Sequence, residues 1–279
     1  MLLNSIKYKY INLLKFTLID YYRTNYYEHL PVSKKRSLFI FKFLIWLLNL
    51  FKPNTYILCE KKFISRIDRE EGKDCPVLAE SMIGLKRMDN IEKCIFDIIE
   101  NKVEGDLIET GVWRGGAVIF MKGILEVLDI KDRKVWVADS FEGLPKPKKE
   151  EYYWDKDDKH YKIKELQVDL DIVKENFKKY ELLDGNVIFL KGWFKDTLPK
   201  AKIEKLSLLR LDGDMYESTM DALKYLYPKL SKGGYIIIDD WGAVNGCKQA
   251  VLDYRLNNNI NEKIINVDGL CIYWQKKKD

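Results

Sequence analysis

Short apolar runs alternate with amphipathic segments from residue 105 to the end of the chain. The apolar runs predict strands at 106–109, 134–138, 186–190, 206–211 and 235–238. Between them, apolar residues at helical spacing predict helices at 116–129, 168–180, 217–229 and 246–258. At the end, two runs at 263–267 and 270–275 flank Asp268-Gly269, which predicts an antiparallel hairpin. The whole pattern predicts an α/β fold with a doubly wound, Rossmann-like sheet.

The N-terminal region has a different pattern. Residues 2–30 carry apolar side chains near helical spacing, which predicts a helix that Pro31 ends, and 38–51 is almost wholly apolar. The second run contains Lys42 and is shorter than the roughly 20 residues that span a bilayer. Two interpretations remain open: a helix that packs on the body or on a dimer partner, and an interfacial anchor whose basic residues face anionic headgroups.

The next segment joins these two regions. Residues 60–80 are polar and predict a linker, and 81–101 predict a loop that enters a helix. We therefore divide the chain into a helical extension (1–59), a linker with a lid and helix (60–104) and a catalytic domain (105–279).

The charge distribution separates the extension from the body. Residues 1–59 hold nine Lys and Arg against Asp20 and Glu28, whereas the remainder holds 39 basic against 41 acidic residues. A nearly neutral body argues against nucleic-acid binding. Five scattered cysteines without a Cys-x-x-Cys pair indicate thiols in a reducing cytoplasm, and two histidines exclude a multi-histidine metal site. We expect a cytoplasmic protein, and the inner membrane face is where an anchor would act.

The segment 105–116 has the most informative motif. A buried strand ends at Glu109 and turns through Gly111, Gly115 and Gly116 into a helix. Because the spacing is Gly-x-x-x-Gly-Gly, the dinucleotide fingerprint is absent and no pyrophosphate cradle is implied. Glu109 would repel a phosphate and attract an ammonium, so S-adenosylmethionine fits better than a dinucleotide.

Acidic residues follow the other predicted strands. Asp139 is placed to bind a ribose diol, or else to cap the turn that follows it. Asp212 and Asp214 follow one strand, and Asp239-Asp240 follow the next. If these strands are neighbours, the four carboxylates repel one another, and a divalent cation such as Mg²⁺ or Ca²⁺ resolves that repulsion. The alternative is that they cap two helices.

Two further segments complete the predicted pocket. Gly192-Trp193-Phe194 follows a strand and either stacks on an adenine or packs in the core. The charged, aromatic stretch 145–165 predicts a mobile solvated loop that could also cover an acceptor.

Several sequence blocks occur together in a fixed order. They are Glu109–Gly116, Val135–Phe141, Gly192–Thr197, Leu211–Asp214 and Ile238–Asp240, preceded by Ser81–Asn90. In this combination the chain, from about residue 69 to its end, closely resembles the macrocin O-methyltransferase (TylF) family, whereas 1–59 lies largely outside the resemblance. The resemblance implies the class I methyltransferase fold and an enzyme that methylates sugar hydroxyls with S-adenosylmethionine and Mg²⁺.

The resemblance also implies roles for individual residues. Asp212, Asp239 and Asp240 would hold the metal, and Asp214 would be the general base. The cofactor site would comprise Met82, Glu109, Thr110, Gly111, Trp113, Arg114, Gly115, Gly116, Asp139, Ser140, Phe141, Gly192, Trp193, Phe194 and Asp212. The loop 241–246 departs from many relatives, which leaves the acceptor in doubt.

Three functions follow from these observations. The first is methylation of a sugar hydroxyl on a nucleotide, lipid, polysaccharide or glycosylated metabolite. The second keeps the chemistry and changes the acceptor to a catechol-like phenol or another small hydroxyl compound. The third is a cofactor-binding scaffold without turnover at a membrane-associated assembly. We also expect a homo-oligomer and no nucleic-acid partner.

Overall fold

The computed structural model describes residues 5–29, 39–53, 55–57, 59–74, 76–148 and 150–278. Pro31, the basic cluster Lys34-Lys35-Arg36 and Cys75 lie outside these ranges. Within them, no helix has both the length and the apolar character needed to cross a membrane. The four described cysteines form no disulfide with one another.

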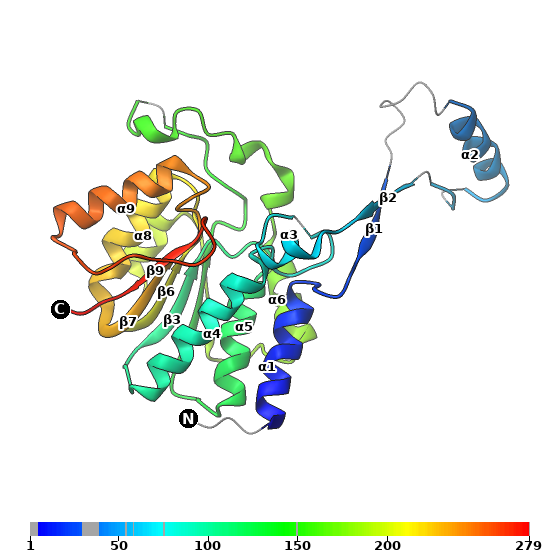
Figure 1. The fold of residues 1–279 in the computed structure, drawn as a ribbon. Coiled ribbons are helices and arrows are strands. Elements are labelled where there is room, and N and C mark those ends of the chain that lie inside the picture. Colours follow the sequence, from blue (N-terminus) through cyan, green and yellow to red (C-terminus); the bar gives the residue numbers. More distant parts are fainter. Residues whose placement is uncertain are drawn as a thin grey trace.

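A seven-stranded sheet forms the centre of the molecule, in the order β5-β4-β3-β6-β7-β9-β8 (Figure 1). Its strands are β3 (Asp106–Thr110), β4 (Val135–Asp139), β5 (Val187–Lys191), β6 (Leu206–Leu211), β7 (Leu230–Ile238), β8 (Ile265–Asn266) and β9 (Ile272–Gln275). The first five are parallel, and β9 runs antiparallel to both β7 and β8. This confirms the predicted doubly wound sheet with a terminal hairpin, which is the class I methyltransferase fold.

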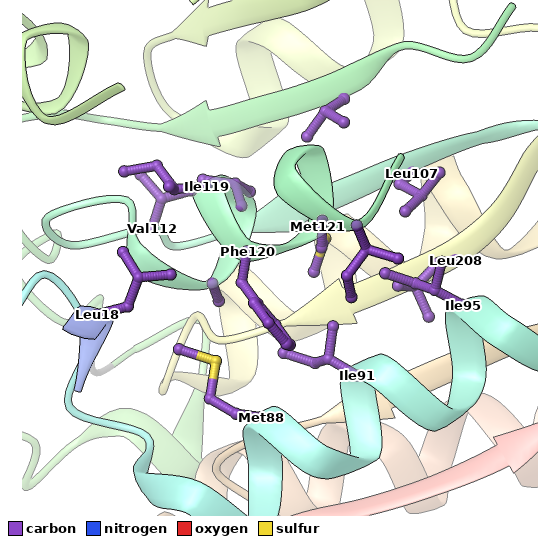
Figure 2. Packing of buried hydrophobic residues seen from close by; sticks show 14 of the residues in the cluster. Leu18, Met88, Ile91, Ile95, Leu107, Val112, Ile119, Phe120, Met121 and Leu208 are labelled. Carbon is purple, nitrogen blue, oxygen red and sulfur yellow. The ribbon is translucent and has the colours of Figure 1, made fainter. Parts of the chain in front are cut away.

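Helices cover both faces of the sheet. The helices from residue 66 onward are α3 (Arg66–Glu70), which packs on α4, and α4 (Gly84–Glu100), α5 (Gly116–Val127), α6 (Leu170–Lys179), α7 (Phe194–Thr197), α8 (Tyr216–Leu226) and α9 (Asn245–Asn257). Successive strand residues point to opposite faces, so Leu107 joins the cluster under α4 and α5, while Ile108 joins the cluster under α8 and α9. Figure 2 shows the first cluster, in which Phe120 of α5 lies beside Met88 and Ile91 of α4.

The N-terminal region contains α1 (Ser5–Leu18), β1 (Asn25–His29), α2 (Phe39–Phe51) and β2 (Cys59–Phe63). Helix α1 packs on α5 and buries Ile11, Leu14 and Leu18 in the main core. Strands β1 and β2 form an antiparallel ribbon that carries α2 away from the sheet (Figure 1).

Two expectations for this region are wrong. The helix predicted over 2–30 ends at Leu18, because Asp20 adopts a left-handed φ of 50° and the chain then enters β1. The linker predicted at 60–80 contains part of β2 and all of α3. Arg69 of α3 is buried, donates to the carbonyls of Ile19 and Asp20, and pairs with Asp74. These contacts fix the segment to the end of α1.

Candidate functional site

A cavity of about 710 Å³ lies at the carboxyl ends of the parallel strands, where the chain leaves β3 for one side of the sheet and β6 for the other. This is the switch point at which open α/β sheets bind ligands. Of the predicted residues, the cavity is lined by Met82, Glu109, Gly111, Trp113, Asp139, Ser140, Trp193, Phe194, Asp212, Asp214, Asp239 and Asp240. The others, which are Thr110, Arg114, Gly115, Gly116, Phe141 and Gly192, do not line the cavity.

Two predicted residues that do not line the cavity, Arg114 and Gly116, support its shape. Arg114 stacks on Trp113 and donates to the carbonyls of Val77 and Ala79. Gly116 opens α5 against the backbone of Glu80, where an added Cβ would lie 2.6 Å from the carbonyl carbon. These contacts hold the segment before Met82 beside α5.

Gly111 allows two strand ends to meet. Its φ is +84°, and a Cβ at this position would lie 1.7 Å from the carbonyl oxygen of Asp212. Only glycine fits such a close approach. The turn after β3 therefore lies directly against the turn after β6, and both border the cavity.

Asp139 ends β4 and accepts hydrogen bonds from two backbone amides. The Val112 N–H donates to one oxygen and the Phe141 N–H to the other, each at 2.7 Å. Burial raises the pKa of Asp139, and these two hydrogen bonds counter part of that rise. The carboxylate is therefore fixed in one orientation at the cavity wall, where its remaining lone pairs can accept from a diol.

Arg210 is central to the acidic cluster. It projects from the carboxyl end of β6, is fully buried, and donates to Glu109, Asp212 and Asp239. Arg87 of α4 donates to the other carboxylate oxygen of Asp239 at 2.5 Å and to Asp268 at 2.7 Å. The sequence analysis treated the carboxylates as unpaired, whereas the two arginines bind Asp212 and Asp239.

Negative charge nevertheless remains in excess at the cluster. Carboxylate oxygens of Asp212, Asp239 and Asp240 lie within 4.8 Å of one another. Burial, followed by the charge of Asp239, raises the pKa of Asp212 to about 6, and burial and Asp214 raise the pKa of Asp240 strongly. Three carboxylates this close together, two of them with raised pKa values, form an oxygen ligand set that fits a divalent cation.

Glu109 fits a cationic group in the same cavity. One of its carboxylate oxygens binds Arg210, and the other is buried without a hydrogen-bond partner among the described residues. Burial raises the pKa of Glu109 to about 8, although Arg210 opposes the rise. An ammonium group, such as that of the amino-acid end of S-adenosylmethionine, would satisfy this oxygen.

Asp214 lies next to the cluster in a strained conformation. Its φ is +56°, and its backbone N–H donates to Asp240 at 2.9 Å. Burial and the neighbouring Asp212 raise the pKa of Asp214 to about 7. A left-handed backbone at a non-glycine residue is typical of functional sites.

The segment 145–165, predicted as a mobile solvated loop, is mostly exposed or half-buried, but part of it is folded onto the body. It contains three short 3₁₀ turns, and Asp155 is buried. Both oxygens of Asp155 accept from the first amides of α8, those of Tyr216 at 2.7 Å and Glu217 at 3.0 Å. Lys148 pairs with Glu217 in the same region. The segment is thus anchored to α8 and forms a wall of the cavity.

His160 is a site residue that the sequence analysis missed. It lines the cavity, and its Nδ1 lies 2.6 Å from Asp158. Burial lowers the pKa of His160, but Asp158 and the charge of Asp214 raise it by more, so the net shift is upward. The sequence contained one signal, an Asp-x-His spacing within the segment 145–165.

Known proteins resemble this chain over most of its length. A family model described as macrocin-O-methyltransferase (TylF) matches residues 7–276, and so extends into the N-terminal region that the sequence analysis left outside the resemblance. A demethyldecarbamoylnovobiocin O-methyltransferase from Streptomyces niveus is 51% identical over 211 residues, which cover 75% of this chain and 80% of the relative.

Two further comparisons agree with that match. The 8-demethyl-8-(2,3-dimethoxy-alpha-L-rhamnosyl)-tetracenomycin-C 4'-O-methyltransferase of Streptomyces olivaceus is 48% identical over 205 residues, which cover 73% of this chain and 78% of the relative. The solved structure of the O-methyltransferase NovP superposes with a TM-score of 0.82 and 40% identity, covering 98% of this chain and all of NovP.

Proposed function

Because this chain belongs to the macrocin O-methyltransferase (TylF) family, we propose that it methylates a sugar hydroxyl with the help of a divalent cation. Family and fold make it an O-methyltransferase that depends on S-adenosylmethionine. The observation that carries the proposal is the cavity, in which Glu109, Asp139 and the cluster of Asp212, Asp239 and Asp240 share one wall. A relative whose name includes a rhamnosyl group supports a sugar acceptor.

The residues divide into two groups by function. Glu109 and Asp139 would bind the methyl donor. Glu109 would bind the donor's ammonium group, and Asp139 would bind the donor's ribose. S-adenosylmethionine, when bound, supplies a methyl group on a sulfonium that leaves as a neutral thioether. Trp113, Trp193 and Phe194 would exclude water from the same part of the cavity.

The acidic cluster would prepare the acceptor. Asp212, Asp239 and Asp240 would hold the divalent cation, which lowers the pKa of a hydroxyl bound to it. Asp214 would accept the hydroxyl proton as the general base. Arg210 and Arg87 would keep the carboxylates fixed, and the segment anchored by Asp155 would cover the acceptor.

An acceptor panel with methyl-labelled S-adenosylmethionine tests this proposal. We expect mass spectrometry to find the label on a sugar hydroxyl in Mg²⁺, and its loss in EDTA and in Asp214→Asn. Asp196→Asn, at an exposed position on α7, is the matched control and should keep full activity. Label on catechols but on no sugar would favour the phenol alternative instead. Full Mg²⁺-independent activity, or full activity of Asp214→Asn, would contradict the roles given to the acidic cluster.

The scaffold without turnover is the weakest of the three functions. The relatives that match this chain are named O-methyltransferases, and every acid proposed for metal binding is present in the cavity.

A further inference from the structure

Helix α2 exposes an apolar surface that nothing in the proposed reaction uses. Its large side chains are between 40% and 82% exposed, and they are Ile40, Phe41, Phe43, Leu44, Trp46, Leu47, Leu48, Leu50 and Phe51. The β1-β2 ribbon holds this helix clear of the sheet (Figure 1). A continuous apolar surface of this kind marks a site of interaction.

The helix nevertheless has two distinct sides. At 100° for each residue, the exposed apolar side chains span roughly 220° of its circumference. The remaining stripe holds Lys42, Ile45 and Asn49, which are the half-buried residues of α2. The Asn49 side chain accepts from the amides of Thr55 and Tyr56 and donates to the Tyr56 carbonyl. Thr55 and Tyr56 therefore lie against this stripe at Asn49, and the apolar side stays exposed.

The size and charge of this region restrict its partner. Thirteen residues make a helix of about 20 Å, which is shorter than the roughly 30 Å hydrocarbon core of a bilayer. Between residues 30 and 58 the sequence holds no acidic residue and five cations, which are Lys34, Lys35, Arg36, Lys42 and Lys52. A short helix with a wide apolar side, in a stretch of sequence whose only charges are positive, suits the surface of an anionic membrane.

We propose that α2 inserts its apolar side into the headgroup region of an anionic lipid bilayer and anchors the enzyme there. A second copy of the chain fits less well. Packing against another helix covers a stripe of about 100° and would leave the rest of the apolar side in water. It would also bring two sets of five cations together. Acyl chains cover the whole apolar side, and anionic headgroups neutralise the cations. This inference does not depend on the acceptor or on the metal.

Vesicle co-sedimentation of the full chain tests the proposal. We expect binding to vesicles of phosphatidylcholine and phosphatidylglycerol (3:1), and at least tenfold weaker binding to phosphatidylcholine alone. The triple variant Phe43→Ser, Trp46→Ser, Leu47→Ser should bind the anionic vesicles at least tenfold more weakly. Its thermal unfolding should be unchanged, because these side chains contact little of the body.

The matched control removes exposed apolar residues from another helix. Ile6 and Leu13 of α1 are 77% and 62% exposed, and the double variant Ile6→Ser, Leu13→Ser should bind vesicles like the wild type. Sedimentation of the protein without lipid tests the alternative partner, which is a second copy of the chain. If the triple variant turns a dimer into a monomer and the wild type ignores anionic vesicles, α2 binds a second copy and the proposal is wrong. Equal vesicle binding by the wild type and the triple variant would also overturn it.

Discussion

Arg210 on β6 donates to Asp239, the residue that follows β7, and both side chains are buried from solvent. The same guanidinium reaches Glu109 near the carboxyl end of β3, so one side chain connects the ends of three neighbouring strands. One residue that would bind the donor, Glu109, and two that would bind the metal, Asp212 and Asp239, are therefore held by the same guanidinium. Their relative positions depend on the sheet register that places Glu109 opposite Arg210.

Replacing this cation should destabilise the fold. Arg210→Met leaves several buried carboxylates without their partner, which should lower the free energy of unfolding by about 3–5 kcal/mol. Urea unfolding measures this change. Arg23→Met, at a half-exposed pair with Asp20, is the control and should change it by less than about 0.5 kcal/mol. A loss below 1 kcal/mol for Arg210→Met would show that the guanidinium is not the main partner of these acids.

The close approach at Gly111 gives a second prediction. Gly111→Ala places a methyl group 1.7 Å from the Asp212 carbonyl oxygen and adds left-handed strain, which alone costs about 1–3 kcal/mol. We expect at least that loss of stability in urea, together with weakened binding of S-adenosylhomocysteine. Gly185→Ala is the matched control, because a Cβ there meets nothing within 4 Å. If both variants unfold at the same urea concentration, the turn after β3 is looser than described.

Asp155 should couple the segment 145–165 to α8. Asp155→Ala removes both hydrogen bonds to the first turn of α8, which should cost about 1–2 kcal/mol. Hydrogen exchange should become faster in 150–166, and the KM for the acceptor should rise more than kcat falls. Asp157→Ala, at an exposed neighbouring position, should leave exchange unchanged. Unaltered exchange in Asp155→Ala would mean that other contacts hold the segment.

His160 allows a direct test by NMR, because the sequence contains only two histidines. Asp158 and the charge of Asp214 should hold the pKa of His160 above its usual 6.5. The charged form is thus favoured by folding, so its contribution to stability is present below pH 6.5 and is lost as the pH rises through the folded value. Asp158→Asn should lower the pKa of His160. An unchanged titration in that variant would remove Asp158 as the cause.

Much of the fold follows from local patterns in the sequence. Short apolar runs predicted the parallel strands, and Asp268-Gly269 predicted the terminal hairpin. The β1-β2 ribbon was not predicted, because its strands carry charged residues such as Lys61 and Lys62 and pair across about thirty residues. Local pattern is a weak guide where a strand is polar on both sides and its partner is distant.

The site was predicted unevenly for a similar reason. Acidic residues at strand ends are visible in the sequence, since each immediately follows an apolar run. Their partners are not, because Arg87 and Asp239 are separated by 152 positions and meet only after folding. Arg210 gave one available signal, as a charged residue inside the apolar strand 206–211. A buried charge in such a strand requires a partner.

The most direct test of the account is a calorimetric titration of the full chain with S-adenosylhomocysteine, in Mg²⁺ and again in EDTA. The account predicts saturable one-site binding in both conditions, because Glu109 and Asp139 bind the donor without the metal. It also predicts at least tenfold weaker binding in Asp139→Ala, which removes the carboxylate fixed by Val112 and Phe141. Absence of binding in both conditions, or equal affinity in Asp139→Ala, would contradict the assignment of this cavity as the methyl-donor site.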